Sequence, residues 1–492
     1  MLTLPPVVQP LTTTIPLAVK RSLELELRRR LGDEQVASDP LDLYVFGKDS
    51  GLVRGEPGLV VFPRNTTEVA TIMRLAGRHG VPVVPRGSGT GLAGGAVTTG
   101  PHVLLVTTRM NRIGPVDVEN RCVWVQPGVI NLDLSIHTTP LGLHYAPDPS
   151  SQSVCTIGGN VANNSGGPHC LAEGTTVNHV LAMEIVTSDG DVLSIGGPAP
   201  DPTGLDIRGL MVGSEGTLGI VTDVLVNLLP PPPASRTILL AFPEVQNAAA
   251  TVSGIIANGL IPAALEMMDQ PMTIAVERFA NAGFPTDSAA VLIAEVTGHP
   301  SAVDAEAELV RRLAVSHRAT LTRIASDEAE RKRIWLGRKS AFGAIAQMNP
   351  DYYLHDTVVP RTRLVEAIEQ TYAISKRHDI PMLNVFHAGD GNLHPLMSFD
   401  ASVPGVMERV DAAGRDLIEM CVAIGGSLSG EHGIGMEKRD YMHLVFDEMG
   451  LDAQARIREA LDPDGRLNPG KIVPQGSRCF DFGRPPPVGA WV

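Results

Sequence analysis

Two histidines in the last third of the chain flank a segment that predicts a β-hairpin. His387 precedes and His394 follows the dipeptide Asp390-Gly391, which is favoured as the two-residue turn between twisted strands. With that turn, His387 would lie directly opposite His394, with the Cβ atoms about 5 Å apart on one face of the ribbon. Two imidazoles in this arrangement can bind one divalent metal ion. They can equally be a solvent-exposed pair, and the pattern alone leaves both readings open.

A third candidate group lies in residues 427–435, where glycines flank an acid and a histidine. Glu431 and His432 are adjacent, and adjacent side chains of an extended chain point to opposite sides. Both could act at one site only if the chain wraps around that site, which the glycines permit. A plain surface turn is the alternative.

Glycine-rich loops in the first half of the chain offer backbone N–H groups to a large ligand. Residues 89–94 match the GxGxxG pattern, but residues 93–101 make a poor helix and no acid lies between His79 and Asp117 to hold a ribose. A Rossmann dinucleotide site needs both features. Arg86 with residues 87–91 instead supplies closely spaced N–H donors, two hydroxyls and a guanidinium, which suit a pyrophosphate.

Two further glycine- and amide-rich stretches, residues 145–167 and 213–221, are long and polar. Loops of this kind in a compact domain are usually functional or disordered. The apolar residues Val154, Ile157 and Val161 favour an ordered loop. We therefore expect these stretches to line a large ligand.

Composition excludes several classes of protein. The formal charge is −14 and no long basic run is present, which argues against nucleic-acid binding. The five cysteines contain no Cys-x-x-Cys pair for zinc, iron–sulfur or dithiol chemistry. No apolar run reaches the roughly 18 residues of a bilayer span, so we expect a cytoplasmic protein, with peripheral docking on a membrane partner left open.

The elements that must position these residues fall into two regions on either side of the prolines at 230–233. Before them, a helix at 15–31 precedes a strand–helix–strand unit, in which Asn65 begins a helix between strands 58–63 and 81–85. Short strands at 103–107, 122–126 and 181–187 follow between long loops. Beyond the prolines, helices alternate with strands; we expect helices at 248–259, 302–313, 327–348 and 363–377 and strands at 237–241, 290–296 and 382–387.

Several of these segments resemble, in order and spacing, a known family. Residues 86–96, 127–133, 145–167 and 213–221 resemble the FAD-binding domain of the vanillyl-alcohol oxidase type flavoproteins. Residues 335–471 are similar to the C-terminal substrate domain of FAD-linked 2-hydroxy acid dehydrogenases. The resemblance implies an α+β fold, with a two-subdomain FAD-binding domain followed by an α+β cap domain. The parts we expect are an N-terminal segment and helix (1–50), the FAD-binding domain (51–233), the cap domain with a metal site (234–475) and a tail (476–492).

The resemblance also implies which residues hold FAD. The pyrophosphate would lie on Arg86, Gly87, Ser88, Gly89, Thr90, Gly91 and Leu92. The flavin and its ribityl chain would be lined by Pro147, Asp148, Thr156, Gly158, Gly159, Asn163, Gly166 and Ile220. Some relatives tether FAD through a histidine in these loops, but none lies between His79 and His102 and His169 does not match that motif, so FAD should be noncovalent.

For the cap domain, the resemblance implies a divalent metal ion, zinc or manganese or iron, on His387, His394 and Glu431. His432 would be the catalytic base, and Arg338 would face the substrate. Relatives that act on 2-hydroxyglutarate place a hydroxyl and a lysine where this chain has Phe342 and Leu354, which favours a short monocarboxylate. Lys471 matches a terminal motif of the family, without a firm role.

The function implied is FAD-dependent oxidation of a small 2-hydroxy acid, glycolate or D-lactate, with hydride passing to the flavin. Electrons would leave to iron–sulfur and second flavoprotein subunits or to another acceptor, such as the quinone chain. The alternatives are D-2-hydroxyglutarate as the substrate, or a non-catalytic flavin-carrying assembly subunit. A homodimer is left open.

Overall fold

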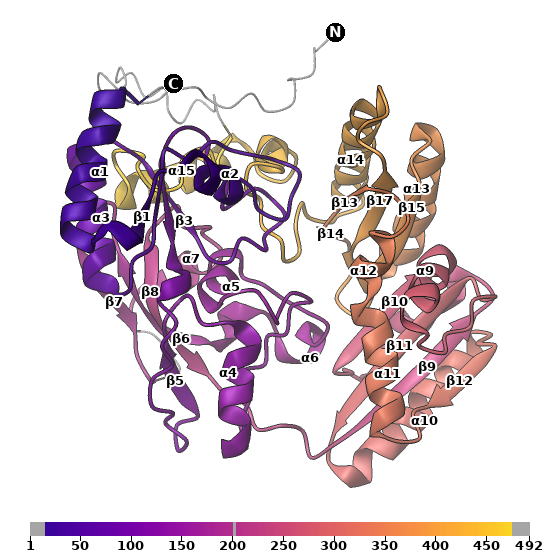
Figure 1. The fold of residues 1–492 in the computed structure, drawn as a ribbon. Coiled ribbons are helices and arrows are strands. Elements are labelled where there is room, and N and C mark those ends of the chain that lie inside the picture. Colours follow the sequence, from indigo (N-terminus) through magenta and orange to yellow (C-terminus); the bar gives the residue numbers. More distant parts are fainter. Residues whose placement is uncertain (1–14, 200–202, 475–492) are drawn as a thin grey trace.

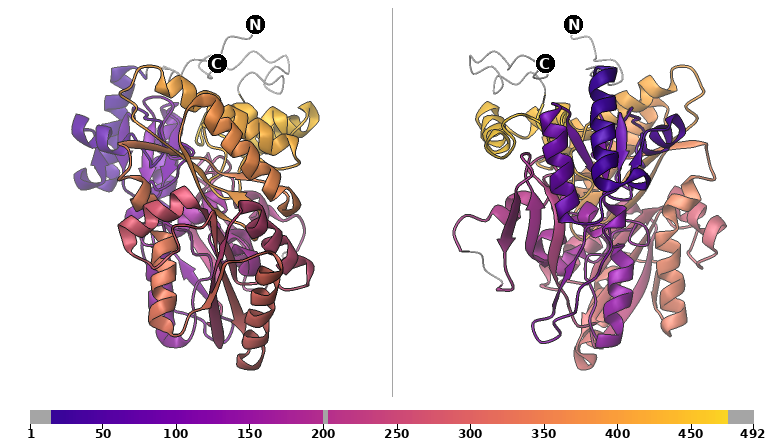
Figure 2. Two further views of the ribbon diagram at one scale, coloured as in Figure 1. Left: turned by 90° about the vertical axis from the view of Figure 1, so that its right-hand side faces the viewer. Right: turned by 60° about the vertical axis from the view of Figure 1, so that its left-hand side comes forward.

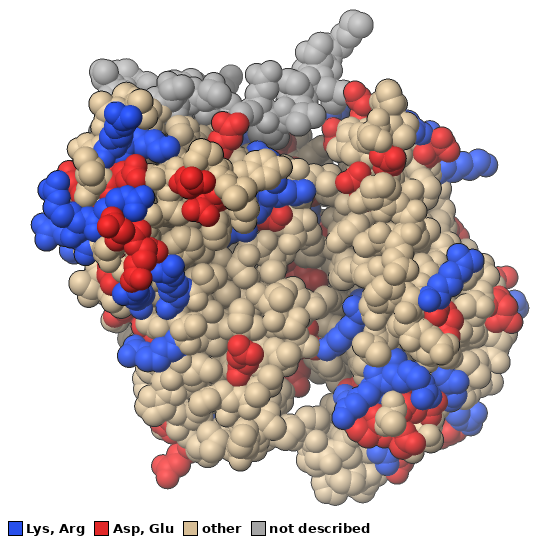
Figure 3. Space-filling view, in the orientation of Figure 1, with Lys and Arg blue, Asp and Glu red and all other residues tan. Residues whose placement is uncertain are grey.

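The computed structural model describes residues 15–199 and 203–474; residues 1–14 and the expected tail at 476–492 lie outside the described residues. The elements form two lobes that face each other, each with helices packed on β-sheets (Figure 1). The predicted α+β class is confirmed. A furrow runs between the lobes on the face shown in Figure 3.

The first sheet of the first lobe has the order β1-β2-β4-β3. Its strands are β1 (Val36–Ala37), β2 (Leu59–Val61), β3 (Val83–Arg86) and β4 (Val103–Val106). Strands β2, β4 and β3 are parallel, so β4 is inserted between the two strands of the predicted strand–helix–strand unit. The arrangement places Arg86 at the end of β3, where the glycine-rich loop begins.

Helix α3 (Thr66–Arg78) connects β2 to β3 and starts as its sequence indicates. The Asn65 side chain accepts the N–H of Glu68, which satisfies one of the unpaired donors of the first turn. The apolar stripe of α3, which includes Val69, Ile72 and Met73, is buried. Helix α1 (Leu17–Leu31) packs on the same layer through buried Leu23 and Leu27 and ends at Gly32.

The second sheet of this lobe is antiparallel with the order β5-β8-β6-β7. Its strands are β5 (Cys122–Val125), β6 (Val180–Val186), β7 (Val192–Gly196) and β8 (Ile220–Asn227). The remaining helices of the lobe are α2 (Pro40–Phe46), α4 (Asn131–Thr138), α5 (Ile157–Asn163), α6 (Cys170–Glu173) and α7 (Ile207–Met211). The stretch at 145–167 is thus an ordered loop that ends in a short helix, α5.

The second lobe is built on one nine-stranded sheet. The path runs β12-β9-β11-β10-β15-β16-β14, and β17 joins β15 to β13. The strands are β9 (Ala234–Phe242), β10 (Ala264–Asp269), β11 (Ala290–Gly298), β12 (Leu321–Ile324), β13 (Asp351–Leu354), β14 (Thr357–Val358), β15 (Met382–His387), β16 (Asn392–Leu393) and β17 (Pro395–Phe399). The helices of this lobe are α8 (Val245–Ala257), α9 (Gln270–Ala280), α10 (Pro300–Ser316), α11 (Glu328–Lys339), α12 (Ala341–Ile345), α13 (Leu364–His378) and α14 (Val406–Ala423). The last helix of the chain, α15 (Glu448–Leu461), lies beside the first lobe.

The single helix expected at residues 327–348 is wrong, because the chain forms two helices, α11 and α12, with a break at Ser340. The Ser340 hydroxyl donates a hydrogen bond to the carbonyl of Leu336. A serine that bonds back by four residues bends a helix. The break ends α11 directly after Arg338 and Lys339.

The last segment, which includes α15, returns to the first lobe (Figures 1 and 2). The N–H of Val83 donates to the carbonyl of Arg466, and the N–H of Asn468 donates to the carbonyl of Val83, so this segment pairs with β3. The fully buried Lys471 donates from Nζ to the carbonyl of Val97 over 2.6 Å. The end of the chain therefore supports the first lobe, although the sequence that precedes it builds the second.

Among residues 15–199 and 203–474, no helix has both the length and the apolar character that crossing a lipid bilayer requires.

Candidate active site

A cavity of about 360 Å³ lies where the two lobes meet. All three glycine-rich stretches contribute to its wall, and so do side chains of the second lobe. The residues flagged from the sequence that line it are Arg86, Gly87, Ser88, Gly89, Thr90, Gly91, Leu92, Thr156, Gly158, Gly159, Asn163, Ile220, Arg338, His394, Glu431 and His432.

Four of the predicted site residues lie beside this cavity rather than on its wall: Pro147, Asp148, Gly166 and His387. The carbonyl of Pro147 accepts a hydrogen bond from Asn131 Nδ2. Asp148 binds the His169 ring, with 2.9 Å between Oδ2 and Nδ1. Gly166 lies so close to Glu431 that a Cβ there would come within 2.9 Å of Oε2.

The loop that begins at Arg86 fits an anionic group. Arg86 is only 8% exposed, and its Nε and Nη1 atoms have no hydrogen-bond partner in the described part of the chain. The same holds for the buried Ser88 hydroxyl. Buried polar groups normally have hydrogen-bond partners, so these donors are available to bind an anionic ligand. Gly89 has φ +79°, and a Cβ at this position would collide with the Arg86 guanidinium.

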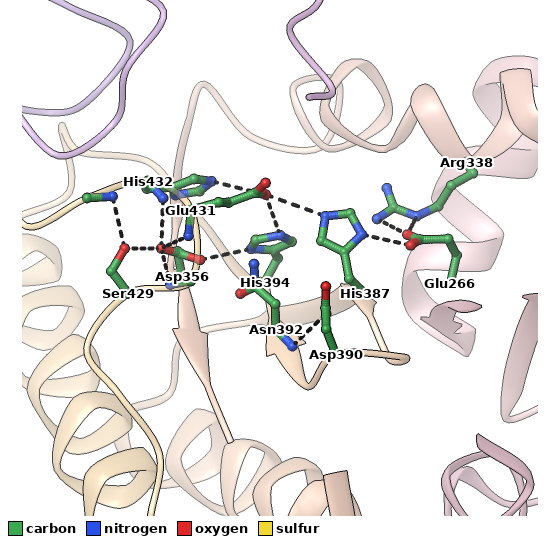
Figure 4. A network of polar contacts seen from close by, with 12 residues as sticks. Glu266, Arg338, Asp356, His387, Asp390, Asn392, His394, Ser429, Glu431 and His432 are labelled. Atoms are coloured by element: carbon green, nitrogen blue, oxygen red, sulfur yellow. Dashed lines mark hydrogen bonds and ion pairs between the residues drawn. The ribbon is translucent and has the colours of Figure 1, made fainter. Parts of the chain in front are cut away.

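At the other end of the cavity, three histidines surround one carboxylate oxygen (Figure 4). Glu431 Oε1 lies 3.4 Å from His387 Nε2, 3.2 Å from His394 Nε2 and 4.0 Å from His432 Nε2. The rings of His387 and His394 are nearly perpendicular, with centroids 5.1 Å apart. Burial alone would raise the pKa of Glu431, but the hydrogen bonds from His387 and His394 hold that pKa well below its ordinary value.

The predicted hairpin register is wrong. His387 pairs with Asn392, not with His394, and residues 388–391 form a longer turn closed by the Gly391 N–H on the carbonyl of His387. The turn is held against a neighbouring segment, since a Cβ at Gly391 would lie 2.1 Å from the carbonyl oxygen of Val359. The two imidazoles still meet, because β17 continues the register of β16 on β15, and His394 lies two residues beyond Asn392 on the same face of the ribbon.

Glu266 is a member of the cluster that the sequence did not indicate. Its Oε1 accepts from His387 Nδ1 over 2.7 Å, and its Oε2 accepts from Arg338 Nη2 and Nε over 2.6 and 2.8 Å. The residue is fully buried, which would raise its pKa, but His387 and Arg338 lower the pKa of this carboxyl. Glu266 thereby fixes the Nδ1 proton of His387 and leaves Nε2 facing Glu431.

Asp356 organises the loop that carries Glu431 and His432. Its Oδ2 accepts the Ser429 hydroxyl over 2.6 Å and the N–H groups of Gly430 and His432 over 3.0 and 3.1 Å. Lys438 Nζ lies 3.3 Å from the same oxygen. The loop wraps around this carboxylate, and for that reason Glu431 and His432 can face one site although they are neighbours in sequence.

The first lobe also holds this loop, because Asn163 Nδ2 donates to the carbonyl of His432 over 2.5 Å. Burial lowers the pKa of His432 to about 4. The imidazole is therefore neutral near pH 7, and a neutral imidazole can accept a proton.

The wall around Arg338 is largely apolar. It consists of Phe342, Tyr352, Leu354 and Val385. Tyr352 was not indicated by the sequence; it lies two residues before Leu354 on β13, so both side chains share one face of that strand. This part of the cavity offers one cation and little other polar surface.

The donor set can hold a divalent cation. His387, His394 and Glu431 place two ring nitrogens and a carboxylate oxygen within 4.8 Å of one another, and this combination of ligands is typical of zinc and related ions. A histidine ligand usually donates its other ring N–H to a carboxylate or a carbonyl, as His387 does to Glu266. A second set, Asp356, His394 and His432, shares His394.

Comparison with known proteins gives matches along most of the chain. Residues 57–196 match the family described as FAD binding domain, and residues 231–472 match FAD linked oxidases, C-terminal domain. Over 430 residues the chain is 47% identical to the glycolate oxidase subunit GlcD of Escherichia coli (strain K12), which covers 87% of this chain and 86% of that protein. It is 30% identical over 468 residues to a D-lactate dehydrogenase of Anaerostipes hadrus, with 93% and 97% covered.

Solved structures share the fold at low sequence identity. The 4-ethylphenol oxidase from Gulosibacter chungangensis, in its isoeugenol complex, superposes with a TM-score of 0.78 at 20% identity. The superposition covers 94% of this chain and 99% of that one.

Proposed function

Because this chain belongs to the family of FAD-linked oxidases and is therefore an FAD-dependent oxidoreductase, we propose that it oxidises a small 2-hydroxy acid, glycolate or D-lactate, to the 2-oxo acid. The observation that carries the proposal is that His394, Glu431 and His432 line the same cavity as the loop that begins at Arg86. The relatives named glycolate oxidase subunit and D-lactate dehydrogenase support this substrate class.

FAD is assigned to the cavity without a covalent bond. Arg86 and Ser88 bring unpartnered buried donors to the pyrophosphate, and the glycines leave room for it. Thr156, Gly158, Gly159, Asn163 and Ile220 are assigned to the flavin side of the cavity. Bound there, FAD would accept the hydride that leaves the α-carbon of the acid.

The substrate is assigned to the end of the cavity that contains Arg338. Glu266 takes the Nε proton and one Nη2 proton of Arg338, and a guanidinium has five N–H donors in all. The others are assigned to the substrate carboxylate. The apolar Phe342 and Leu354 nearby disfavour a second carboxylate, because burying one without partners costs several kcal/mol.

His432 is assigned as the base for the substrate hydroxyl. Its neutral Nε2 lies on the side of Glu431, and Asp356 and Asn163 fix the main chain on either side of the ring. We assign His387, His394 and Glu431 to a divalent ion, zinc or manganese or iron, which would supply positive charge next to the hydroxyl and so lower its pKa. Glu266 orients His387 for that task.

Electrons from the reduced cofactor are assigned to a partner. Within residues 15–199 and 203–474 the cysteines at 122, 155, 170 and 421 are unpaired and scattered, so this part of the chain offers no iron–sulfur ligand set of its own. The GlcD relative is named as a subunit, which fits an iron–sulfur protein or a second flavoprotein subunit as the acceptor. Rapid turnover of the isolated chain with dioxygen would contradict this assignment.

The test of the proposed function is anaerobic addition of glycolate, D-lactate, L-lactate or D-2-hydroxyglutarate to the purified holoprotein, followed by flavin absorbance. We expect rapid bleaching with glycolate or D-lactate. Faster bleaching with D-2-hydroxyglutarate would contradict the assignment of a short monocarboxylate as the substrate. No bleaching with any of the acids would indicate a non-catalytic flavin-carrying subunit.

A further inference from the structure

Glu215, in the loop between α7 and β8, is a buried carboxylate that the reaction as described above does not use. The residue is part of the wall of the active-site cavity and is 4% exposed. The backbone has φ +51°, a left-handed conformation that is uncommon outside glycine. A non-glycine residue held in such a conformation often has a functional reason.

The Glu215 carboxylate binds the main chain of the loop that carries His432. Its Oε1 accepts the N–H of Ile434 over 2.7 Å, and Oε2 accepts the N–H of Gly435 over 2.8 Å. The backbone of Glu215 is itself fixed, since its N–H donates to Ala162 and its carbonyl accepts from Asn468 Nδ2. The carboxylate is thus a fixed point of the first lobe.

Two buried carboxylates from different lobes accept most of the N–H groups of residues 430–435, while the Gly433 N–H donates to Ser429 Oγ. Asp356 of the second lobe takes those of Gly430 and His432. Glu215 of the first lobe takes those of Ile434 and Gly435. His432 lies where the two sets meet, so Glu215 links the position of this residue to the lobe assigned to the flavin.

Glycines in and beside the loop show how closely it fits. A Cβ at Gly433, which has φ +86°, would lie 2.7 Å from Glu215 Oε1. A Cβ at Gly435 would lie 1.9 Å from the carbonyl oxygen of Ala93, which directly follows the residues assigned to the pyrophosphate. The Met436 N–H donates to that same carbonyl. The loop is therefore packed against the FAD-binding lobe without spare room.

We propose that Glu215 is a positioning residue, which holds the main chain of residues 432–435 so that His432 stands at the correct place relative to the flavin. This inference rests on the proposed function of His432 as the base. Both oxygens of Glu215 are engaged by N–H donors, so a side chain at this position needs two acceptor atoms. An amide has only one, and its NH₂ group would face a main-chain N–H.

The test compares wild-type holoprotein with Glu215→Gln and Glu215→Asp. We expect both variants to keep their FAD content and their KM, and the rate constant of anaerobic flavin reduction to fall on the order of tenfold or more in Glu215→Gln, because small misplacements of a reacting group are costly. Glu215→Asp keeps two acceptor oxygens on a shorter side chain, so its rate constant of flavin reduction should fall less. Amide hydrogen exchange in a peptide that covers residues 429–436 should be faster in Glu215→Gln.

Asp462→Asn is the matched control. Asp462 is also buried and also accepts two successive main-chain N–H groups, those of Arg466 and Leu467, but it is not part of the cavity wall. We expect flavin reduction in this variant to stay within about twofold of the wild-type rate, because the loop that carries His432 does not touch it.

Three outcomes overturn the proposal. Unchanged reduction and exchange in Glu215→Gln would show that the contact does not position the loop. Loss of FAD without faster exchange would assign Glu215 to cofactor binding, and a rise of KM alone would assign it to the substrate. If no 2-hydroxy acid reduces the wild-type flavin, the proposed function fails, whereas the exchange measurement still decides whether Glu215 holds the loop.

Discussion

His387 Nδ1 and Glu266 Oε1 lie 2.7 Å apart on the paired strands β15 and β10. The same carboxylate binds Arg338 through its other oxygen. One buried acid therefore sets the ring orientation of a candidate metal ligand and the direction of the candidate substrate arginine (Figure 4). A change at Glu266 should affect both.

Glu266→Gln should lower the affinity for the divalent ion by about 10–100-fold, because the amide is a weaker acceptor for the His387 N–H. Metal content after dialysis against a graded chelator series measures this. Glu295→Gln is the matched control, since Glu295 is a buried acid that binds Arg331 through both oxygens away from the cavity. Equal metal retention in the two variants would contradict the role of Glu266.

His387→Ala and His432→Ala should separate metal binding from proton transfer. His387→Ala should lose metal and activity together, because a ligand is removed. His432→Ala should keep metal and FAD but reduce its flavin about 10²-fold more slowly, as expected for a missing general base. Metal analysis and anaerobic flavin reduction of both variants test this. Near-normal flavin reduction in His432→Ala would contradict the assignment of His432 as the base. Near-normal activity in metal-free His387→Ala would show that the reaction does not need the metal ion.

Arg338→Lys should raise the KM for glycolate or D-lactate about tenfold or more, because an ammonium cannot bind Glu266 and a substrate carboxylate with a planar fork. Steady-state kinetics with each acid measure the effect. Lys339→Gln, at the adjacent exposed position of α11, is the control and should change nothing. A KM for Arg338→Lys equal to that of wild type would exclude contact between Arg338 and the substrate.

Acid precipitation should release the flavin into the supernatant, because the three glycine-rich stretches, residues 86–96, 145–167 and 213–221, contain no histidine that could tether it. His169, which follows the second of these loops, binds Asp148 and Glu295 at 2.9 and 3.6 Å. Flavin absorbance of supernatant and pellet checks the prediction. Yellow colour that stays with the pellet would show a covalent bond.

The contact between His169 of the first lobe and Glu295 of the second should make stability depend on pH. Burial would lower the pKa of His169, but the charges of Asp148 and Glu295 raise it to about 10. The pKa of Glu295 is lowered, since hydrogen bonds from His169 and Arg331 outweigh its burial. His169 therefore stabilises the fold fully below its unfolded pKa of about 6.5 and stops doing so as the pH rises through about 10, while Glu295 contributes fully above about pH 4.5.

His169→Gln should therefore lower the free energy of unfolding by about 1–2 kcal/mol at pH 6, and the difference from wild type should shrink toward pH 10. Urea unfolding of both proteins at pH 6, 8 and 9.5 measures it. His137→Gln, at an exposed position of α4, is the control. A difference that stays constant from pH 6 to pH 9.5 would contradict the ionic nature of the contact.

Local sequence signals predicted the features that depend on neighbouring residues. Asn65 begins α3 because its side chain reaches an N–H three residues away, and the apolar stripe of α3 indicates its buried face. The unsuitability of residues 93–101 for a helix excluded a Rossmann site. The glycines after Arg86 indicated a loop with room for a ligand, and the structure places that loop on the cavity.

Partners from distant segments could not be predicted in this way. Glu266 lies 121 residues before His387, and Glu215 lies 219 residues before Ile434, so no spacing marks either contact. The hairpin register was wrong because the turn is packed against Val359, a contact outside the hairpin. The return of residues 466–471 to β3 likewise depends on main-chain bonds between the two ends of the chain.

The sequence by itself therefore determined the kinds of groups available: glycine loops for an anion, histidines and a carboxylate for a metal ion, and a base. The tertiary structure decided which acids hold these groups, because a buried carboxylate acts through the N–H groups that the fold brings to it. Glu266, Asp356 and Glu215 each occupy a position of that kind. Hydrogen bonds of 2.5–3 Å depend on the packing of whole sheets and lobes, which no short pattern of residues contains.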